Sequence, residues 1–104
     1  MPLGNYIVLQ EGVPERVHMV SHVIDRRDIA DPRTGQMVSR NVALFTCDRL
    51  NGSPISATLS VMSEKLFRQL EPYIPGQQYT RYDFVITKTG SGFATNFKVE
   101  RIPL

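Results

Sequence analysis

Cysteine is almost absent from the sequence, and this scarcity excludes one class of small protein. Cys47 is the only cysteine, so no disulfide can form within the chain and a disulfide-stapled secreted domain is excluded. No apolar run approaches the roughly 20 residues that a membrane-spanning helix needs. The start of the chain also lacks a charged segment followed by a long apolar run, so we expect no signal peptide and a cytoplasmic location.

Motifs for catalysis and metal binding are missing as well. The chain has no Walker-type phosphate loop, no G-x-S-x-G and no H-E-x-x-H motif. His18 and His22 share a strand face but have no third ligand near them in sequence, so we predict no metal site. Cys47 lies in an apolar segment, where a buried thiol is unreactive. We therefore predict a protein that is not an enzyme and that uses no cofactor.

The size and charge of the chain limit what it can be. Its 104 residues suffice for one hydrophobic core, so we expect a single domain over 1–104, with 1–15 as an N-terminal arm. The net charge is only +2, but it is unevenly distributed. Residues 26–49 hold five arginines against three acids, whereas 1–15 hold two acids and no base. This asymmetry is compatible with a polyanionic partner.

Hydrophobic periodicity predicts five β-strands. They are expected at 16–25, 38–50, 54–62, 79–89 and 93–102. The first strand switches faces midway, which indicates a bulge or a strong bend. The second has apolar residues on both faces and is therefore expected to be central in the sheet. Asn51 and Gly52 predict a tight hairpin turn between the second and third strands.

One short helix is expected between the third and fourth strands. Leu66, Phe67 and Leu70 form an apolar stripe, with Ser63 as the N-cap and Pro72 ending the helix. The order β-β-β-α-β-β predicts an all-β protein with one short helix, specifically an OB-fold, a five-stranded Greek-key barrel. A ferredoxin-like fold would need a helix after the first strand, and an SH3-like barrel would lack this one.

An OB barrel binds ligands on its second and third strands, framed by the loops after the first and fourth strands. Here those loops are 26–40, which is rich in arginine, and 88–93, which is rich in glycine. Guanidinium groups bind phosphate oxygens, and aromatic rings stack on bases. The candidate nucleic-acid-binding residues are Arg26, Arg27, Arg33, Arg40, Arg49, Tyr79, Arg81, Lys88, Phe93 and Lys98. Tyr79 and Arg81 are expected on the non-core side of strand four.

Simpler structural interpretations of these residues stay open. Asp25, Asp28 and Asp31 lie close enough in sequence to neutralise the neighbouring arginines, which would leave a solvated hairpin. The alternation of the last strand also lets Phe93 belong to the core, and the same holds for Tyr79.

Three features in the second part of the chain resemble a known family. They are Arg33 with Gly35, the segment LFTCDRLNGSPISATLSV and the ending PGQQYTRYDFVITKTGSGFATNFKVERIPL. With them, residues 33–104 resemble the helix-destabilising, single-stranded-DNA-binding proteins of filamentous phages, the gene V type, which are small OB-fold proteins with a protruding basic hairpin.

The resemblance implies a homodimer that coats single-stranded DNA cooperatively in replication, with Arg33, Phe93 and Lys98 on the DNA. Met37 and Val38 stand where such proteins have an aromatic residue, so a bacterial or plasmid single-strand-binding relative stays open. Two other hypotheses remain: a single-stranded RNA binder, or a protein-interaction module whose arm LGNYIVLQEG adds a strand to a partner's sheet.

Overall fold

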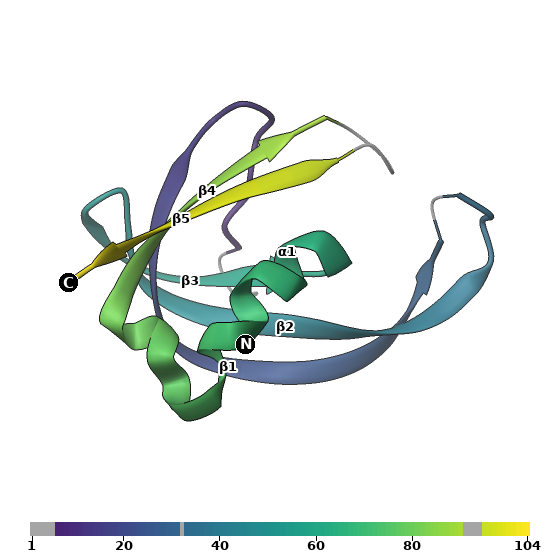
Figure 1. The fold of residues 1–104 in the computed structure, drawn as a ribbon, viewed down its shortest axis with the longest axis horizontal. Helices are drawn as coiled ribbons and strands as arrows, with labels where there is room; N and C mark the ends of the chain where they lie inside the picture. The colour runs from purple at the N-terminus through teal and green to yellow at the C-terminus, as the bar shows by residue number, and fades with distance from the viewer. Residues whose placement is uncertain (1–5, 32, 91–94) are drawn as a thin grey trace.

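A five-stranded antiparallel sheet with one short α-helix makes up the fold (Figure 1). The computed structural model describes residues 6–31, 33–90 and 95–104. The strands are β1 (Glu15–Ala30), β2 (Met37–Leu50), β3 (Ser53–Val61), β4 (Tyr82–Thr89) and β5 (Asn96–Pro103). The helices are α1 (Glu64–Leu70) and the 3-10 helices η1 (Glu71–Tyr73) and η2 (Pro75–Arg81). The predicted class, mostly β with one short helix, is confirmed.

The sheet has the order β3-β2-β1-β4-β5, with β1 in the centre. Among the described residues, no ladder joins β3 to β5, so the sheet is not closed into a barrel. β2 lies between β1 and β3, as its two apolar faces predict. None of the helices in the described part of the chain is long and apolar enough to cross a membrane.

β1 and β2 are much longer than the other strands and form a curved ribbon that extends beyond them (Figure 1). β4 pairs with β1 only over residues 15–17, and β3 pairs with β2 only as far as Ala43. Past these points β1 and β2 pair only with each other within the described residues, ending at Ala30 and Met37. We call residues 23–30 and 37–42 the ribbon extension.

The predicted loop at 26–40 is therefore wrong for most of its length. Arg27 pairs with Arg40 in the ladder, and only residues 31–36 connect the two strands. This run is charged and lacks the apolar alternation that predicts a strand. A two-stranded ribbon, however, buries little on either face, so polar residues are compatible with the strand conformation there.

The first strand contains the expected irregularity. The β1–β2 register shifts between His18 and Met19 and again between Met19 and Ser21, which marks a β-bulge. Val17 and Met19 are fully buried on the core side. His18 is also buried, with Nδ1 2.6 Å from the Asp48 carboxylate and Nε2 2.9 Å from the Thr80 carbonyl oxygen.

Local signals in the sequence position the turn and the helix. Asn51 and Gly52 adopt φ of 52° and 82°, the left-handed values that a tight hairpin turn requires. The Ser63 hydroxyl accepts a hydrogen bond from the Leu66 N–H and caps α1. Both predictions are confirmed, and the helix ends at Leu70, two residues before the proline.

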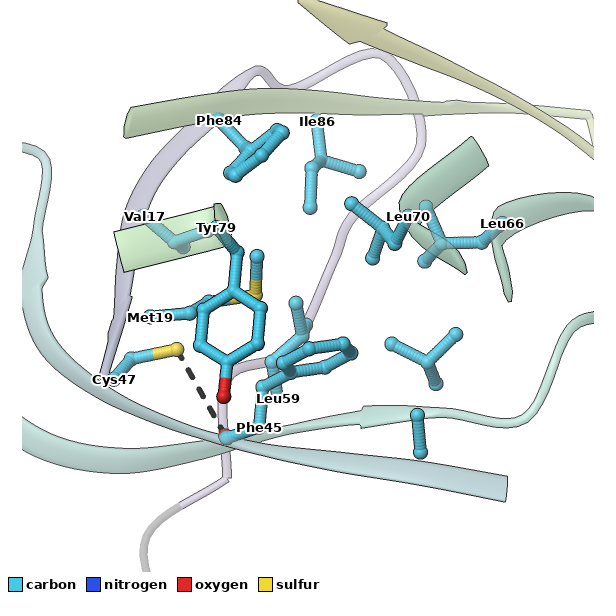
Figure 2. Close-up of a cluster of buried hydrophobic side chains, with 12 residues drawn as sticks. Val17, Met19, Phe45, Cys47, Leu59, Leu66, Leu70, Tyr79, Phe84 and Ile86 are labelled. Carbon is cyan, nitrogen blue, oxygen red and sulfur yellow. Dashed lines mark hydrogen bonds between the residues drawn. The ribbon is translucent and has the colours of Figure 1, made fainter. Parts of the chain in front are cut away.

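The core lies between the sheet, α1 and η2, and Figure 2 shows Tyr79 inside it. Its ring packs edge-on against Phe45, with the centroids 5.3 Å apart, and its hydroxyl lies 2.6 Å from His22 Nδ1. Burial raises the pKa of Tyr79 above its usual value. The prediction that Tyr79 lies on the non-core side of a strand is wrong, because strand β4 begins only at Tyr82 and η2 carries Tyr79 into the core.

The N-terminal arm pairs with its own sheet. The Ile7 N–H donates to the Thr58 carbonyl of β3 at 2.9 Å, and the Gly12 N–H donates to the Lys88 carbonyl of β4 at 2.7 Å. Ile7 and Leu9 pack against the core between these two points. The arm thus joins β3 and β4, which are not neighbours in the sheet.

Tyr79 provides a test of the core. Replacing Tyr79 by Ala is expected to lower the free energy of unfolding by about 3–5 kcal/mol, because it leaves a cavity under η2. Tyr79→Phe removes only the contact with His22 and should cost about 1 kcal/mol. Urea unfolding followed by circular dichroism measures both values. Similar, small losses for the two variants would contradict a buried ring.

Candidate nucleic-acid interface

A groove of about 390 Å³ lies between the ribbon extension and α1. We call it the ribbon–α1 groove. Its walls carry Arg26, Ser39, Arg40 and Asn41 on one side and Met62, Glu64, Phe67, Arg68 and Glu71 on the other. Three arginines from β1, β2 and α1 therefore surround one opening, together with two glutamates.

The ends of the shorter strands explain how this groove forms. β3 ends at Val61, opposite Ala43 of β2, and the Ser63 cap then starts α1. The first turn of the helix therefore lies beside the part of β2 that has lost its β3 partner. Arg26 is opposite Asn41 in the β1–β2 ladder, which adds side chains of both strands to the same wall.

Glu64 is the main carboxylate partner in this groove. It lies 3.6 Å from the Arg40 guanidinium and accepts a hydrogen bond from Arg68, four residues later on the helix. Half of the Glu64 side chain and about three quarters of the Arg68 side chain are exposed, and such surface ion pairs contribute little stability. The Arg26 guanidinium makes no ion pair with any described residue. A phosphate group can therefore compete for all three cations.

The tip of the ribbon positions Arg33. Asp31 organises this turn, because its side chain accepts from the Arg33 N–H at 2.8 Å and its carbonyl accepts from the Gly35 N–H at 2.7 Å. Gly35 has φ of 73°, a value that favours glycine. The Arg33 guanidinium is left exposed, with no ion pair to a described residue.

The sequence leaves open that Asp25, Asp28 and Asp31 neutralise the arginines near them, and the structure shows such a pair at Arg27. Arg27 donates from Nε to Asp25 at 3.1 Å. Asp25 and Asp31 otherwise accept backbone N–H groups, and Asp28 accepts from the Ser39 hydroxyl at 3.0 Å. Arg27 therefore has a carboxylate partner, and it does not line the ribbon–α1 groove.

Arg49 lies at the far end of β2 in a separate cluster. Its guanidinium is 3.6 Å from Asp83, which also accepts from Arg16 Nε at 2.7 Å. Asp83 is only 6% exposed, so its charge needs these two partners. One Asp83 oxygen, Oδ1, has no hydrogen-bond partner within the described structure and faces Arg49. This cluster holds β1, β2 and β4 together.

Lys98, Arg81 and Lys88 also lie outside the ribbon–α1 groove. Lys98 donates to Glu100 at 2.9 Å, and this hydrogen bond raises the pKa of Lys98. Arg81 is exposed at the end of η2, and Lys88 is half-buried opposite Phe97. Phe93 lies outside the described residues. Of the predicted set, the structure thus brings together Arg26 and Arg40.

Sequence reasoning missed the part of the groove that α1 supplies. Glu64, Phe67, Arg68 and Glu71 are spaced i, i+3, i+4 and i+7, so they share one face of a helix. This spacing was available in the sequence. The apolar stripe of Leu66, Phe67 and Leu70 predicts the helix, but it does not indicate that the face with Glu64 and Arg68 lies beside the ribbon extension.

The described histidine and cysteine side chains belong to no metal-binding group. No group of three or more His, Cys, Asp or Glu side chains within the described residues is placed to hold a metal ion. Cys47 is fully buried, as predicted, and burial raises the pKa of its thiol to about 12 because the thiolate is poorly solvated.

Comparison with known proteins yields no match to a family model, a curated protein or a solved structure. The resemblance to the gene V type proteins therefore stays a prediction.

The Asp83 cluster yields a stability test. Asp83→Asn keeps the shape of the side chain but removes the charge that faces Arg16 and Arg49, so the free energy of unfolding should fall by about 1–3 kcal/mol. Arg49→Met should be destabilising as well. Arg27→Met, which breaks an exposed pair, is the control and should change stability by less than about 0.5 kcal/mol. Equal effects of Arg49→Met and Arg27→Met in urea unfolding would count against a structural role for Arg49.

Proposed function

We propose that the protein binds single-stranded DNA, largely independently of sequence, through the ribbon extension and the ribbon–α1 groove. The supporting observation is the convergence of Arg26, Arg40 and Arg68 on one groove, with Arg33 at the ribbon tip. Cations that bind phosphates supply most of the affinity for nucleic acid and make it salt-dependent. In the same groove, the Phe67 ring can stack on a base and the Asn41 amide can form hydrogen bonds with it.

The shape of the groove favours a single strand over a duplex. Its two walls come from a β-ribbon and a helix, so a ligand must reach Phe67 between them. An unpaired strand can turn a base toward that ring, whereas a duplex keeps its bases stacked inside.

We also propose that the sheet is an OB-fold. The strand order and the position of α1 between β3 and β4 support this assignment. OB-folds bind ligands on the outer side of β2 and β3. In this chain the cross-strand pairs on that side are Leu44–Ser60 and Thr46–Thr58, and neither pair contains a cationic residue. In this chain the arginines are displaced toward the ribbon extension.

The homodimer and a role in coating replicating DNA, in the cytoplasm of a cell or of a viral host, belong to the same proposal. The ribbon extension exposes Val23 by 62%, Ile24 by 42% and Met37 by 65%. A ribbon of two strands is only marginally stable in water by itself. Contact with a second copy would cover these side chains and stabilise the extension.

The protein-interaction hypothesis has less support. In this hypothesis the arm LGNYIVLQEG adds a strand to a partner's sheet, but Ile7 and Gly12 of the arm pair with β3 and β4 of the same chain. Single-stranded RNA is the alternative ligand, because arginines that bind phosphates and a ring that stacks on a base act on either kind of strand.

The double variant Arg26→Gln/Arg40→Gln tests the groove directly. Its affinity for fluorescent oligo-dT should fall on the order of tenfold to a hundredfold, because two charge-assisted phosphate contacts are lost. The slope of log K against log salt should shrink by about 0.7 per lost contact. Fluorescence anisotropy over a sodium chloride series measures both. Arg81→Gln, which removes an exposed cation outside both the ribbon extension and the groove, is the control, and an equal loss there would refute the assignment.

Glu64 offers a test in the opposite direction. Glu64→Gln removes the carboxylate that competes with phosphate for Arg40 and Arg68, so oligo-dT should bind about two- to fivefold more tightly. Glu100→Gln makes the same charge change beside Lys98, outside the groove, and should have the smaller effect. Equal gains for the two variants would mean that only net charge matters.

A further inference from the structure

A second groove, of about 450 Å³, lies on the other side of α1, against β5. We call it the α1–β5 groove. It is lined by Arg68, Gln69, Tyr73, Phe84, Val99 and Arg101, among others. Arg101 is opposite Phe84 in the β4–β5 ladder, so it lies on the side of the sheet that faces the core and the helix.

Arg101 is held in this groove by aromatic rings. Its guanidinium carbon lies 5.8 Å from the Tyr73 ring centroid and 5.3 Å from that of Tyr82, and Nη1 donates to the Tyr73 hydroxyl at 3.3 Å. No described carboxylate pairs with it, unlike Arg16, which is bound to Asp83. Stacking fixes the plane of the guanidinium and leaves N–H groups on its edge for an acceptor.

Arg68 connects the two grooves. Its side chain lines the ribbon–α1 groove on one side of the helix and the α1–β5 groove on the other. About three quarters of this side chain is exposed, and its partner Glu64 lies in the first groove. A single strand of DNA that lies along the ribbon extension can therefore cross α1 at Arg68 and stay in contact with arginine side chains.

We propose that the α1–β5 groove is a second subsite for the same strand, in which Arg101 binds a phosphate and Tyr73 contacts a base. This inference rests on the proposed function. A fixed arginine beside a partly exposed tyrosine supplies the two elements of sequence-independent single-strand binding, a cation for the backbone and a ring for the base. In the simpler interpretation Arg101 only packs on the rings of Tyr73 and Tyr82. The two roles predict different effects of oligonucleotide length on the binding of an Arg101 variant.

Oligonucleotide length separates the two roles. Arg101→Met should leave the binding of oligo-dT of about 4 nucleotides unchanged, because a short strand occupies one groove. Binding of about 16 nucleotides should weaken roughly tenfold, and its salt slope should shrink by about 0.7. Arg81→Met, which removes an exposed cation outside both grooves, is the matched control and should affect neither length. Thermal melting of each variant verifies folding.

Two results would overturn the second subsite. One is a long-strand affinity of Arg101→Met equal to that of Arg81→Met. The other comes from photocrosslinking of a long iodouracil-substituted oligonucleotide to the wild-type chain, which needs no variant. Adducts in the ribbon–α1 groove with none at Tyr73 would be that result. An adduct at Tyr73 is expected. If the wild-type chain binds neither oligonucleotide length at low salt, the proposed function itself fails, and that result differs from both.

Discussion

The β1–β2 hydrogen-bond ladder is the interaction on which the rest of the structure depends. It continues from Val17 opposite Leu50 to Ala30 opposite Met37, well past the residues at which β4 stops pairing with β1 and β3 stops pairing with β2. Because the ladder continues, the arginines of the extension are fixed on a twisted ribbon instead of a loose loop. Because β3 stops at Val61, α1 begins beside the ribbon and forms the second wall of a groove.

The distribution of ion pairs divides the basic residues into two kinds. Arg16 and Arg49 are bound to a buried carboxylate at the end of the β1–β2 ladder opposite the ribbon extension, where they join strands. Arg26 and Arg33 are exposed on the ribbon and pair with no described carboxylate. A net charge of +2 therefore understates the local excess of positive charge that a polyanion would meet there.

The sequence predicts the regular parts of this fold well. The alternation of residues 54–62, the Asn51-Gly52 turn and the Ser63 cap are local signals, each with one conformational outcome. The errors arise where tertiary contacts decide. Tyr79 follows strand periodicity, yet Gly76 and Gln77 at positive φ turn the chain before β4 starts. The ribbon–α1 groove forms only because α1, which is distant in sequence, packs beside the ribbon extension. Arg68 of this helix was therefore not predicted as part of the site.

The central claim is that one continuous surface, formed by the ribbon extension and α1, contacts single-stranded nucleic acid. Amide chemical-shift mapping by NMR during titration with oligo-dT tests it most directly, since it reports on every segment at once. Shifts are expected to be concentrated in residues 23–42 and 62–71. Shifts confined to the outer face of β2 and β3 around Thr46 and Thr58, or no shifts at low salt, would contradict it.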